Sequence, residues 1–197
     1  MIYNDLIHYP GFRITLRKAV LADRPVIYKW LAESNITKSM LGEPVYPDAP
    51  VPSFDEFADD FSDGFFSDEI NSPGKSFIIM DGNHEIGTIC YDLMNLQKKW
   101  VILDIWLRDE NCCGKGYGPE ALKLLCIFLF KTKGIINFYI APSKRNFMAI
   151  KSYEKAGFIR LKMNRAQAKR KFGVDIFDYN DNVVLKKVIK ENCRQVV

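Results

Sequence analysis

The sequence is poor in the residues that build metal centres and disulfide frameworks. Its only histidines are His8 and His84, which argues against a histidine-ligated metal and against a histidine-based catalytic triad. Its five cysteines are an odd number without a Cys-x-x-Cys pair, a pattern that fits neither a zinc site nor a set of disulfides. We therefore expect no metal, and we interpret the vicinal Cys112 and Cys113 as small loop residues rather than as a redox switch.

Long hydrophobic runs and a large excess of one charge are also missing. No apolar stretch reaches the roughly 18 residues that a membrane helix needs, and the first residues lack the basic start and apolar block of a signal peptide. We expect a cytoplasmic protein that does not bind membranes. The formal net charge of +4 is too small to indicate nucleic acid binding, although it would favour an anionic cofactor.

The order of predicted elements indicates one α/β (α+β) domain, a mixed β-sheet flanked by helices. A chain of 197 residues can bury roughly 70% of its unfolded surface in one domain. Strands are predicted at 12–18, 75–81, 85–94, 99–107, 135–142, 158–163 and 181–189. Helices are predicted at 22–33, 53–70, 118–132 and 147–156. The proline-rich segment 36–52 is expected to be a loop, and the basic connector 164–174 receives no assignment.

The most informative stretch is 104–118, DIWLRDENCCGKGYG, which reads as a strand, a glycine-rich loop and the start of a long helix. The first turn of a helix has N–H groups without partners and a partial positive charge, so a phosphate can bind there. Gly114, Gly116 and Gly118 would let the backbone approach that phosphate, and Lys115 would add a positive charge. The alternative is that the glycines only form a tight turn.

A second motif favours the phosphate interpretation. Residues 146–158, NFMAIKSYEKAGF, follow Pro142-Ser143 and resemble the closing motif of the GCN5-related N-acetyltransferase (GNAT) superfamily, N-xx-A-I-xx-Y-E-K-x-G-F. The loop 113–118, CGKGYG, is similar to the pyrophosphate signature of that family, Q/R-xx-G-x-G/A, except that Cys113 replaces Gln or Arg. Because backbone amides do most of the phosphate binding, this departure is expected to weaken the cofactor's binding and not to abolish it.

The resemblance covers residues 12–163 and implies an acyl-CoA N-acyltransferase fold for the single domain 1–197, with 164–197 forming an insertion and a last strand. It implies acetyl-CoA as co-substrate, with Asp104 as catalytic base and Tyr153 as general acid. An amide near 105–107 would stabilise the oxyanion where the fourth and fifth strands separate. The implied cofactor-binding residues are Ile105, Trp106, Leu107, Cys113, Gly114, Lys115, Gly116, Tyr117, Gly118 and Asn146.

Each of these residues also has a purely structural interpretation. Asp104 could pair with a nearby Lys or Arg, and Tyr153 could be a core tyrosine. Trp106 is of a type more often found in the core than beside a cofactor. Ser143 or Asn146 can cap the following helix, which would account for Asn146 without any cofactor.

Within the superfamily, the motifs look most like the aminoglycoside 6'-N-acetyltransferases, with the ribosomal-protein N-acetyltransferases next. Against an aminoglycoside, Ala141 stands where that branch often has an aspartate for the drug's ammonium groups, although the acidic segment 55–69 could compensate. We expect direct transfer of acetyl to a primary amine in a ternary complex, on a small-molecule or peptide acceptor, by a monomer or homodimer. The alternative is a non-catalytic acyl-CoA-binding module.

Overall fold

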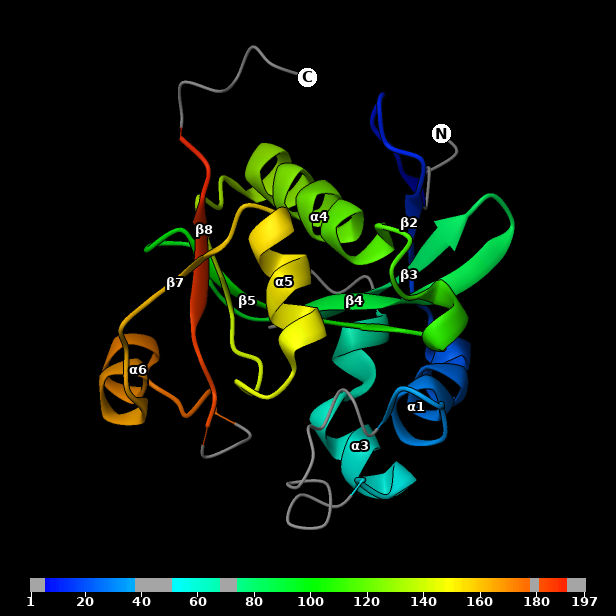
Figure 1. Ribbon diagram of the computed structural model, residues 1–197, viewed down its shortest axis with the longest axis horizontal. Helices are drawn as coiled ribbons and strands as arrows, with labels where there is room; N and C mark the ends of the chain where they lie inside the picture. The colour runs from blue at the N-terminus through cyan, green and yellow to red at the C-terminus, as the bar shows by residue number, and fades with distance from the viewer. Residues whose placement is uncertain (1–5, 38–50, 68–73, 178–180, 191–197) are drawn as a thin grey trace.

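The computed structural model describes residues 6–37, 51–67, 74–177 and 181–190. These residues form one mixed eight-stranded sheet in the order β1-β2-β3-β4-β5-β6-β8-β7 (Figure 1). Neighbouring strands are antiparallel except β5 and β6, which are parallel. The predicted mixed sheet flanked by helices is therefore confirmed, as an α/β fold.

The strands in chain order are β1 (Leu6–Ile7), β2 (Thr15–Lys18), β3 (Lys75–Asp81), β4 (His84–Asn95), β5 (Trp100–Leu107), β6 (Asn137–Ile140), β7 (Ile159–Arg160) and β8 (Leu185–Val188). The α-helices are α1 (Arg24–Ala32), α3 (Phe54–Asp60), α4 (Tyr117–Lys133), α5 (Phe147–Lys155) and α6 (Arg165–Phe172). Short 3-10 helices η1 (Leu21–Asp23), η2 (Asp63–Phe66) and η3 (Glu110–Cys112) complete the described part.

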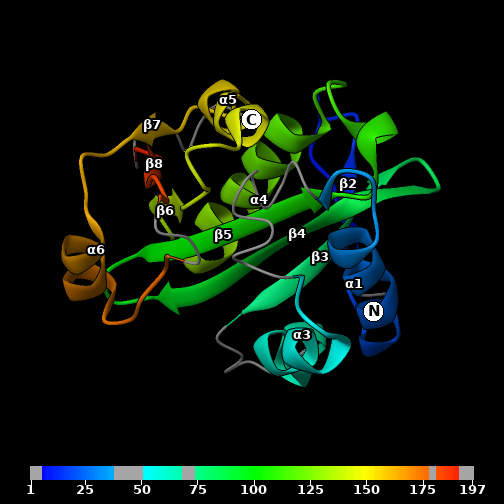
Figure 2. The ribbon, with the colours of Figure 1, turned by 60° about the horizontal axis from the view of Figure 1, so that its bottom comes forward.

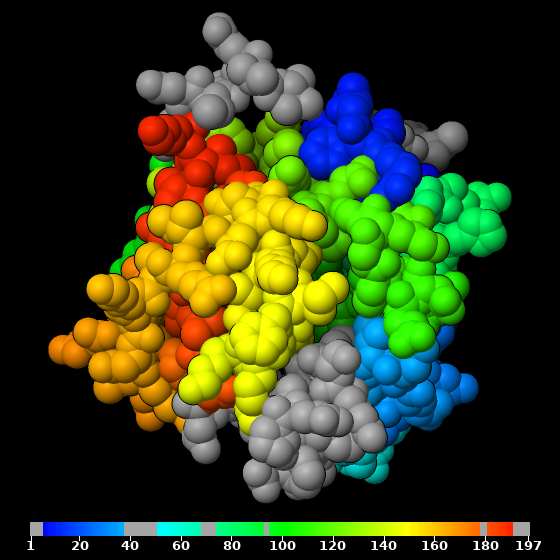
Figure 3. All heavy atoms as spheres, in the orientation of Figure 1, coloured from blue at the N-terminus to red at the C-terminus, as the bar shows by residue number. Residues whose placement is uncertain are grey.

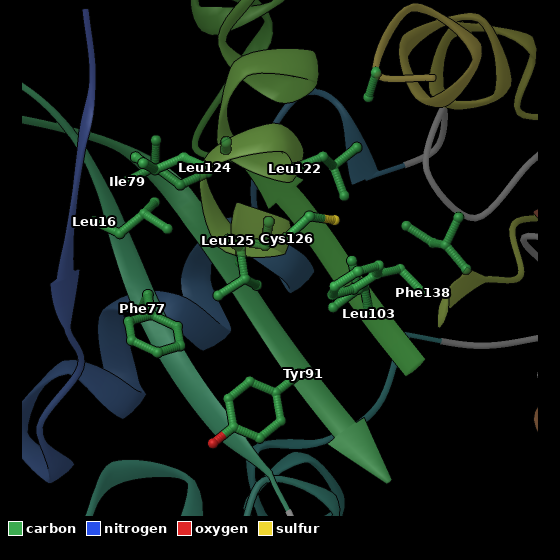
Figure 4. Packing of buried hydrophobic residues seen from close by; sticks show 14 of the residues in the cluster. Leu16, Phe77, Ile79, Tyr91, Leu103, Leu122, Leu124, Leu125, Cys126 and Phe138 are labelled. Atoms are coloured by element: carbon green, nitrogen blue, oxygen red, sulfur yellow. The ribbon is translucent and has the colours of Figure 1, made fainter. Parts of the chain in front are cut away.

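The main hydrophobic core lies between the sheet and helices α4 and α5. Helix α4 presents an apolar stripe that includes Leu122, Leu125 and Leu129, all without solvent exposure. This stripe packs on side chains of β2 to β6, among them Leu103 and Phe138 (Figure 4). Gly134 ends the helix with a positive φ of 67° and donates its N–H to the carbonyls of the last turn. This packing fixes the position of the helix whose first turn follows the glycine loop.

The opposite face of the sheet is covered at one end by α1 and α3 and at the other by α6 (Figure 2). Ile27, Trp30 and Phe57 pack there against Ile78 and Trp106. At the far end, the buried side of α6 contacts another cluster, composed of Trp100, Tyr139, Phe172, Phe177 and Val184 around Ala168. The middle of β5 thus lies between two apolar clusters on this face, one under α1 and α3 and one under α6.

The tight packing of α4 allows a direct test of the fold. Replacing Leu125 with alanine should lower the free energy of unfolding by about 2–5 kcal/mol, because the truncation leaves a cavity in a packed interior. Lys123→Ala, an exposed change on the same helix, is the control and should stay within about 0.5 kcal/mol of the parent. Urea unfolding measures both. Equal losses for the two variants would contradict the assigned face of the helix.

One helix end and two elements differ from the sequence prediction. Helix α3 ends at Asp60 instead of continuing to 70, because Phe61 leaves the helical region and a 3-10 turn follows. The connector after Asn164 is a helix, α6, capped by Asn164 and ended by Gly173. Strand β1, which pairs with β2, lies in a segment to which no element was assigned. The predicted loop 36–52 falls mostly outside the described residues.

Among the described residues, no helix is both long enough and apolar enough to cross a membrane. The same part of the chain contains no group of three or more His, Cys, Asp or Glu side chains placed to hold a metal ion. The finding on helices agrees with the short apolar runs of the sequence.

Candidate functional site

The loop between β5 and α4 presents a row of backbone amides without acceptors. Gly114 and Gly116 adopt φ values of 73° and 87°, a region that side chains disfavour, and α4 begins at Tyr117. The N–H of Glu120 is the first in the helix with an intrahelical partner, the carbonyl of Gly116 at 3.2 Å. Within the described residues, the amides of residues 114–118 donate to no protein atom. These amides, at the positive end of a 17-residue helix, suit an anion.

The loop is exposed at Gly114, Lys115 and Gly116, whereas Tyr117 and Gly118 are buried. Lys115 is exposed, and Gly118 lies so close to α5 that an added Cβ would meet the Oγ of Ser152 at 2.8 Å. In the space-filling view, α5 and the loop that leads into α4 lie on either side of a depression (Figure 3). Gly118 thus serves close helix packing, whereas Gly114 and Gly116 serve backbone conformation.

Cys113 faces its own loop. Its N–H donates to the carbonyl of Glu110 at 2.9 Å, and its thiol lies 3.7 Å from the carbonyl oxygen of Asp109. Burial, with the nearby Cys112 thiol and acidic groups, raises the pKa of Cys113. The pKa of Cys112 is raised as well, mainly by burial. Neither thiol therefore has the lowered pKa of a reactive or redox-sensing cysteine.

Strands β5 and β6 separate after a short paired region. Their register joins 100–102 to 137–139 and goes no further, whereas β5 stays paired with β4 as far as Leu107. The N–H of Arg108 bonds to Ile86, so the antiparallel alternation turns the amides of Ile105 and Leu107 away from β4 and toward the gap. The separation of the fourth and fifth predicted strands is therefore present.

Asp104 lies at the beginning of this gap. The residue is exposed, and its Oδ1 accepts a hydrogen bond of 2.8 Å from the N–H of Ile105. Its side chain shares a face of the sheet with Cys90, its cross-strand partner. Asp92, two residues further along β4, lies on the same face. Because the Ile105 amide already has this acceptor, Leu107 supplies the remaining amide that points into the gap.

Tyr153 lies on α5 and packs in the core between α4, α5 and the sheet. Its side chain is 6% exposed, and its hydroxyl has no hydrogen-bond partner among the described residues, although it is not sealed from solvent. Burial raises the pKa of the Tyr153 phenol, and the negative charge of Asp104 raises it further. The raised pKa keeps the Tyr153 phenol protonated at neutral pH.

Trp106 and Asn146 have structural partners. The indole of Trp106 is buried on the α1 and α3 side, where its N–H donates to the carbonyl of Ile27 at 3.3 Å. Its side chain points away from the glycine loop, so a cofactor contact there would be confined to the backbone. Asn146 caps α5 by accepting from the N–H of Ala149 at 3.0 Å, which decides between the two proposed caps.

Sequence reasoning missed a cluster that supports the glycine loop. Arg13 donates to the carbonyl of Lys115 at 3.0 Å and lies over the Tyr117 ring, 4.3 Å from its centroid. The Tyr117 hydroxyl donates to Asp81, and Glu120 accepts from the N–H groups of Arg13 and Ile14. No local pattern could have revealed these contacts, because the Arg13 and Ile14 contacts join residues more than a hundred positions apart and the contact of Tyr117 with Asp81 spans 36 positions.

Comparison with protein families agrees with this geometry. A family model described as "Acetyltransferase (GNAT) domain" matches residues 13–159, well over half of the chain. A curated relative, the aminoglycoside N(6')-acetyltransferase type 1 of Klebsiella pneumoniae, is 26% identical over an alignment of 157 residues that covers 75% of this chain and 74% of the relative. A protein of the same description from Serratia marcescens matches to the same extent.

Solved structures share the fold at lower identity. RimL, described as the ribosomal L7/L12 alpha-N-protein acetyltransferase in complex with coenzyme A, aligns with a TM-score of 0.69 and 19% identity over 93% of this chain and 98% of its own. The structure of AAC(6')-Ib with paromomycin and acetyl-CoA gives the same TM-score, identity and coverage. At this identity the likeness supports the fold alone.

Proposed function

The chain belongs to the GNAT acetyltransferases and is an acetyl-CoA-dependent N-acetyltransferase, and we propose that it transfers acetyl directly to a primary amine in a ternary complex. The observation that carries the proposal is the row of amides at 114–118 that donate to no described protein atom. Asp104 and Tyr153 would supply the base and the acid. The diphosphate of coenzyme A would lie on these amides, with Lys115 adjacent. The main chain of Leu107, whose amide faces the gap between β5 and β6, would align the acyl arm.

The acceptor amine has to lose a proton before it can attack. An alkyl amine with a pKa of about 10 is mostly ammonium at neutral pH. In our proposal Asp104, exposed at the start of the gap, accepts that proton directly or through a water molecule. The neutral nitrogen then attacks the thioester carbonyl, and the Leu107 amide is the donor best placed to stabilise the resulting oxyanion.

Collapse of the tetrahedral intermediate breaks the carbon–sulfur bond and releases the thiolate of coenzyme A. We assign the protonation of this sulfur to Tyr153. Its raised pKa keeps the phenol protonated at neutral pH, so its proton is available when a negative charge forms beside it. Its hydroxyl has no competing partner among the described residues.

The cysteines favour direct transfer over an acetyl-cysteine intermediate. All four cysteines of the described part, Cys90, Cys112, Cys113 and Cys126, have raised pKa values because of burial, and that of Cys126 reaches about 12. A thiol with a raised pKa is a poor nucleophile at neutral pH. A two-step route through these residues is therefore disfavoured.

For the acceptor we propose an aminoglycoside-like polyamine. Helix α3 exposes Asp55, Asp59 and Asp60, which would attract a polycation even though Ala141 provides no carboxylate. An acidic protein N-terminus is the second candidate. It is favoured by the exposed basic residues of α6, where Lys169, Arg170 and Lys171 follow one another.

Thiol release from acetyl-CoA tests the proposal. The assay should offer three sets of amines: aminoglycosides, simple polyamines and peptides with free N-termini, each beside the same compound with its amines already acetylated. We expect release with aminoglycosides or polyamines and none with the blocked controls. Release with peptides alone would favour the second candidate. If calorimetry detected acetyl-CoA binding but no amine caused release, the chain would be a non-catalytic binding module.

A further inference from the structure

We infer that Arg13 is a positioning residue for the cofactor: it holds the peptide between Lys115 and Gly116 so that the Gly116 amide faces the diphosphate of acetyl-CoA. This inference rests on the proposed function of the 114–118 loop. Arg13 precedes β2 and lies outside both motifs. Its backbone and side chain contact three residues of the loop and of the first turn of α4.

Arg13 fixes the orientation of one peptide group in the loop. The Nη2 of Arg13 lies 3.0 Å from the carbonyl oxygen of Lys115. In a trans peptide the C=O and the following N–H point in opposite directions. A carbonyl held toward Arg13 therefore directs the N–H of Gly116 to the other side of the loop, where no described protein atom accepts it.

The guanidinium is itself held in place. It lies 4.3 Å from the centroid of the Tyr117 ring, in a cation–π contact, and the Tyr117 hydroxyl is tied to Asp81 on β3. A flat guanidinium can stack on a ring and donate in its own plane at the same time, which an ammonium cannot do. The contact therefore connects the glycine-rich loop to the sheet and restricts its movement.

Arg13 also reduces a repulsion. Glu120 lies in the first turn of α4, where its carboxylate would oppose an anion at the same helix end. Oε1 accepts from the N–H of Ile14 at 3.2 Å and from that of Arg13, and Oε2 lies 3.6 Å from the Arg13 guanidinium. The carboxylate is thus turned toward β2 and partly neutralised. One arginine orients an amide and shields the diphosphate from a nearby negative charge.

The test compares two acetyl donors that differ in the group Arg13 is inferred to serve. S-acetylpantetheine keeps the thioester and lacks the diphosphate together with the 3'-phosphoadenosine attached to it. For Arg13→Ala we expect kcat/KM with acetyl-CoA to fall about tenfold through KM, and kcat/KM with S-acetylpantetheine to stay within about twofold. Arg13→Lys, which can donate but cannot stack in the same way, should lie between alanine and the parent. Arg160→Ala, an exposed change on β7, is the matched control and should leave both donors unchanged.

An equal loss with both donors would overturn the inference, since a general disturbance of the fold would affect them alike. No loss with acetyl-CoA would also overturn it. Calorimetric titration with coenzyme A keeps the test independent of turnover: the dissociation constant should rise about tenfold in Arg13→Ala and not in Arg160→Ala. If the parent binds coenzyme A but acetylates no amine, the proposed function fails, and this titration still decides the role of Arg13.

Discussion

The Asp104→Asn variant should lose at least about a hundredfold in kcat, while its dissociation constant for acetyl-CoA stays within about twofold of the parent. An asparagine oxygen can still accept the hydrogen bond from the Ile105 N–H, so the local backbone should be preserved. What disappears is the group that takes the proton from the acceptor ammonium. Steady-state kinetics and calorimetric titration with acetyl-CoA measure the two quantities separately.

The pH dependence of this variant provides a sharper test. Without a base, the reaction depends on free amine, and the fraction of free amine rises about tenfold per pH unit below a pKa of about 10. Raising the pH from about 7 to about 9 should therefore restore much of the lost rate. Asp92→Asn is the control, because it removes a carboxylate from the same sheet face without removing the base. Parent-like activity of Asp104→Asn, or an equal loss in Asp92→Asn, would remove Asp104 from the role of base.

The Gly116→Val variant should bind coenzyme A roughly 10- to 100-fold more weakly. Gly116 has a φ of 87°, and a β-branched residue in that conformation costs about 1–3 kcal/mol or forces the loop to rearrange. Either outcome displaces the amides that we assign to the diphosphate. Isothermal titration with coenzyme A gives the dissociation constant directly.

Gly173→Val is a matched control for this variant. Gly173 has a φ of 84°, lies in open space and follows α6. A valine there imposes a similar backbone strain away from the glycine loop. Both variants should lower the thermal midpoint, but only Gly116→Val should weaken coenzyme A binding. An unchanged dissociation constant in Gly116→Val would argue against the phosphate-binding role of the loop.

The parts of the fold that depend on local signals could be predicted from the sequence. The Ser53 and Glu56 capping box is formed as expected, and α4 ends at Gly134. The hairpin between β3 and β4 closes at Gly82-Asn83, because the register joins Asp81 to His84. These features depend on residues within a few positions of each other, where composition and periodicity carry the information.

Helix α6 was missed although its signal is present. Asn164 accepts from the N–H of Gln167, and the Gln167 side chain accepts from the N–H of Asn164, which is a capping box. The stretch that follows has few apolar residues, so the periodicity that supports other helices is weak here. Only Ala168 and Phe172 are buried. The helix is held by the contact of Phe172 with Trp100 and Tyr139, a tertiary effect.

The candidate site was predictable only in its composition. The two motifs predicted the glycine loop and Tyr153, and the register from the glycine loop predicted Asp104; the roles of these residues stay predictions. Two details of the site depend on the strand register. The Ile105 amide donates a hydrogen bond to the Asp104 carboxylate, and the Trp106 side chain points away from the loop. The support from Arg13 depends on contacts between β2 and α4 that no spacing rule describes.

The position of β8 in the sheet has a consequence for how the protein is made. This late strand lies between β6 and β7, and the Nζ of Lys187 within it donates to the carbonyl of Ala156 at the end of α5, 2.6 Å away. On the ribosome, the segment that carries Tyr153 emerges well before the strand that anchors its far end. We therefore expect the nascent chain to form the glycine-rich loop first and to become active only after β8 has been inserted.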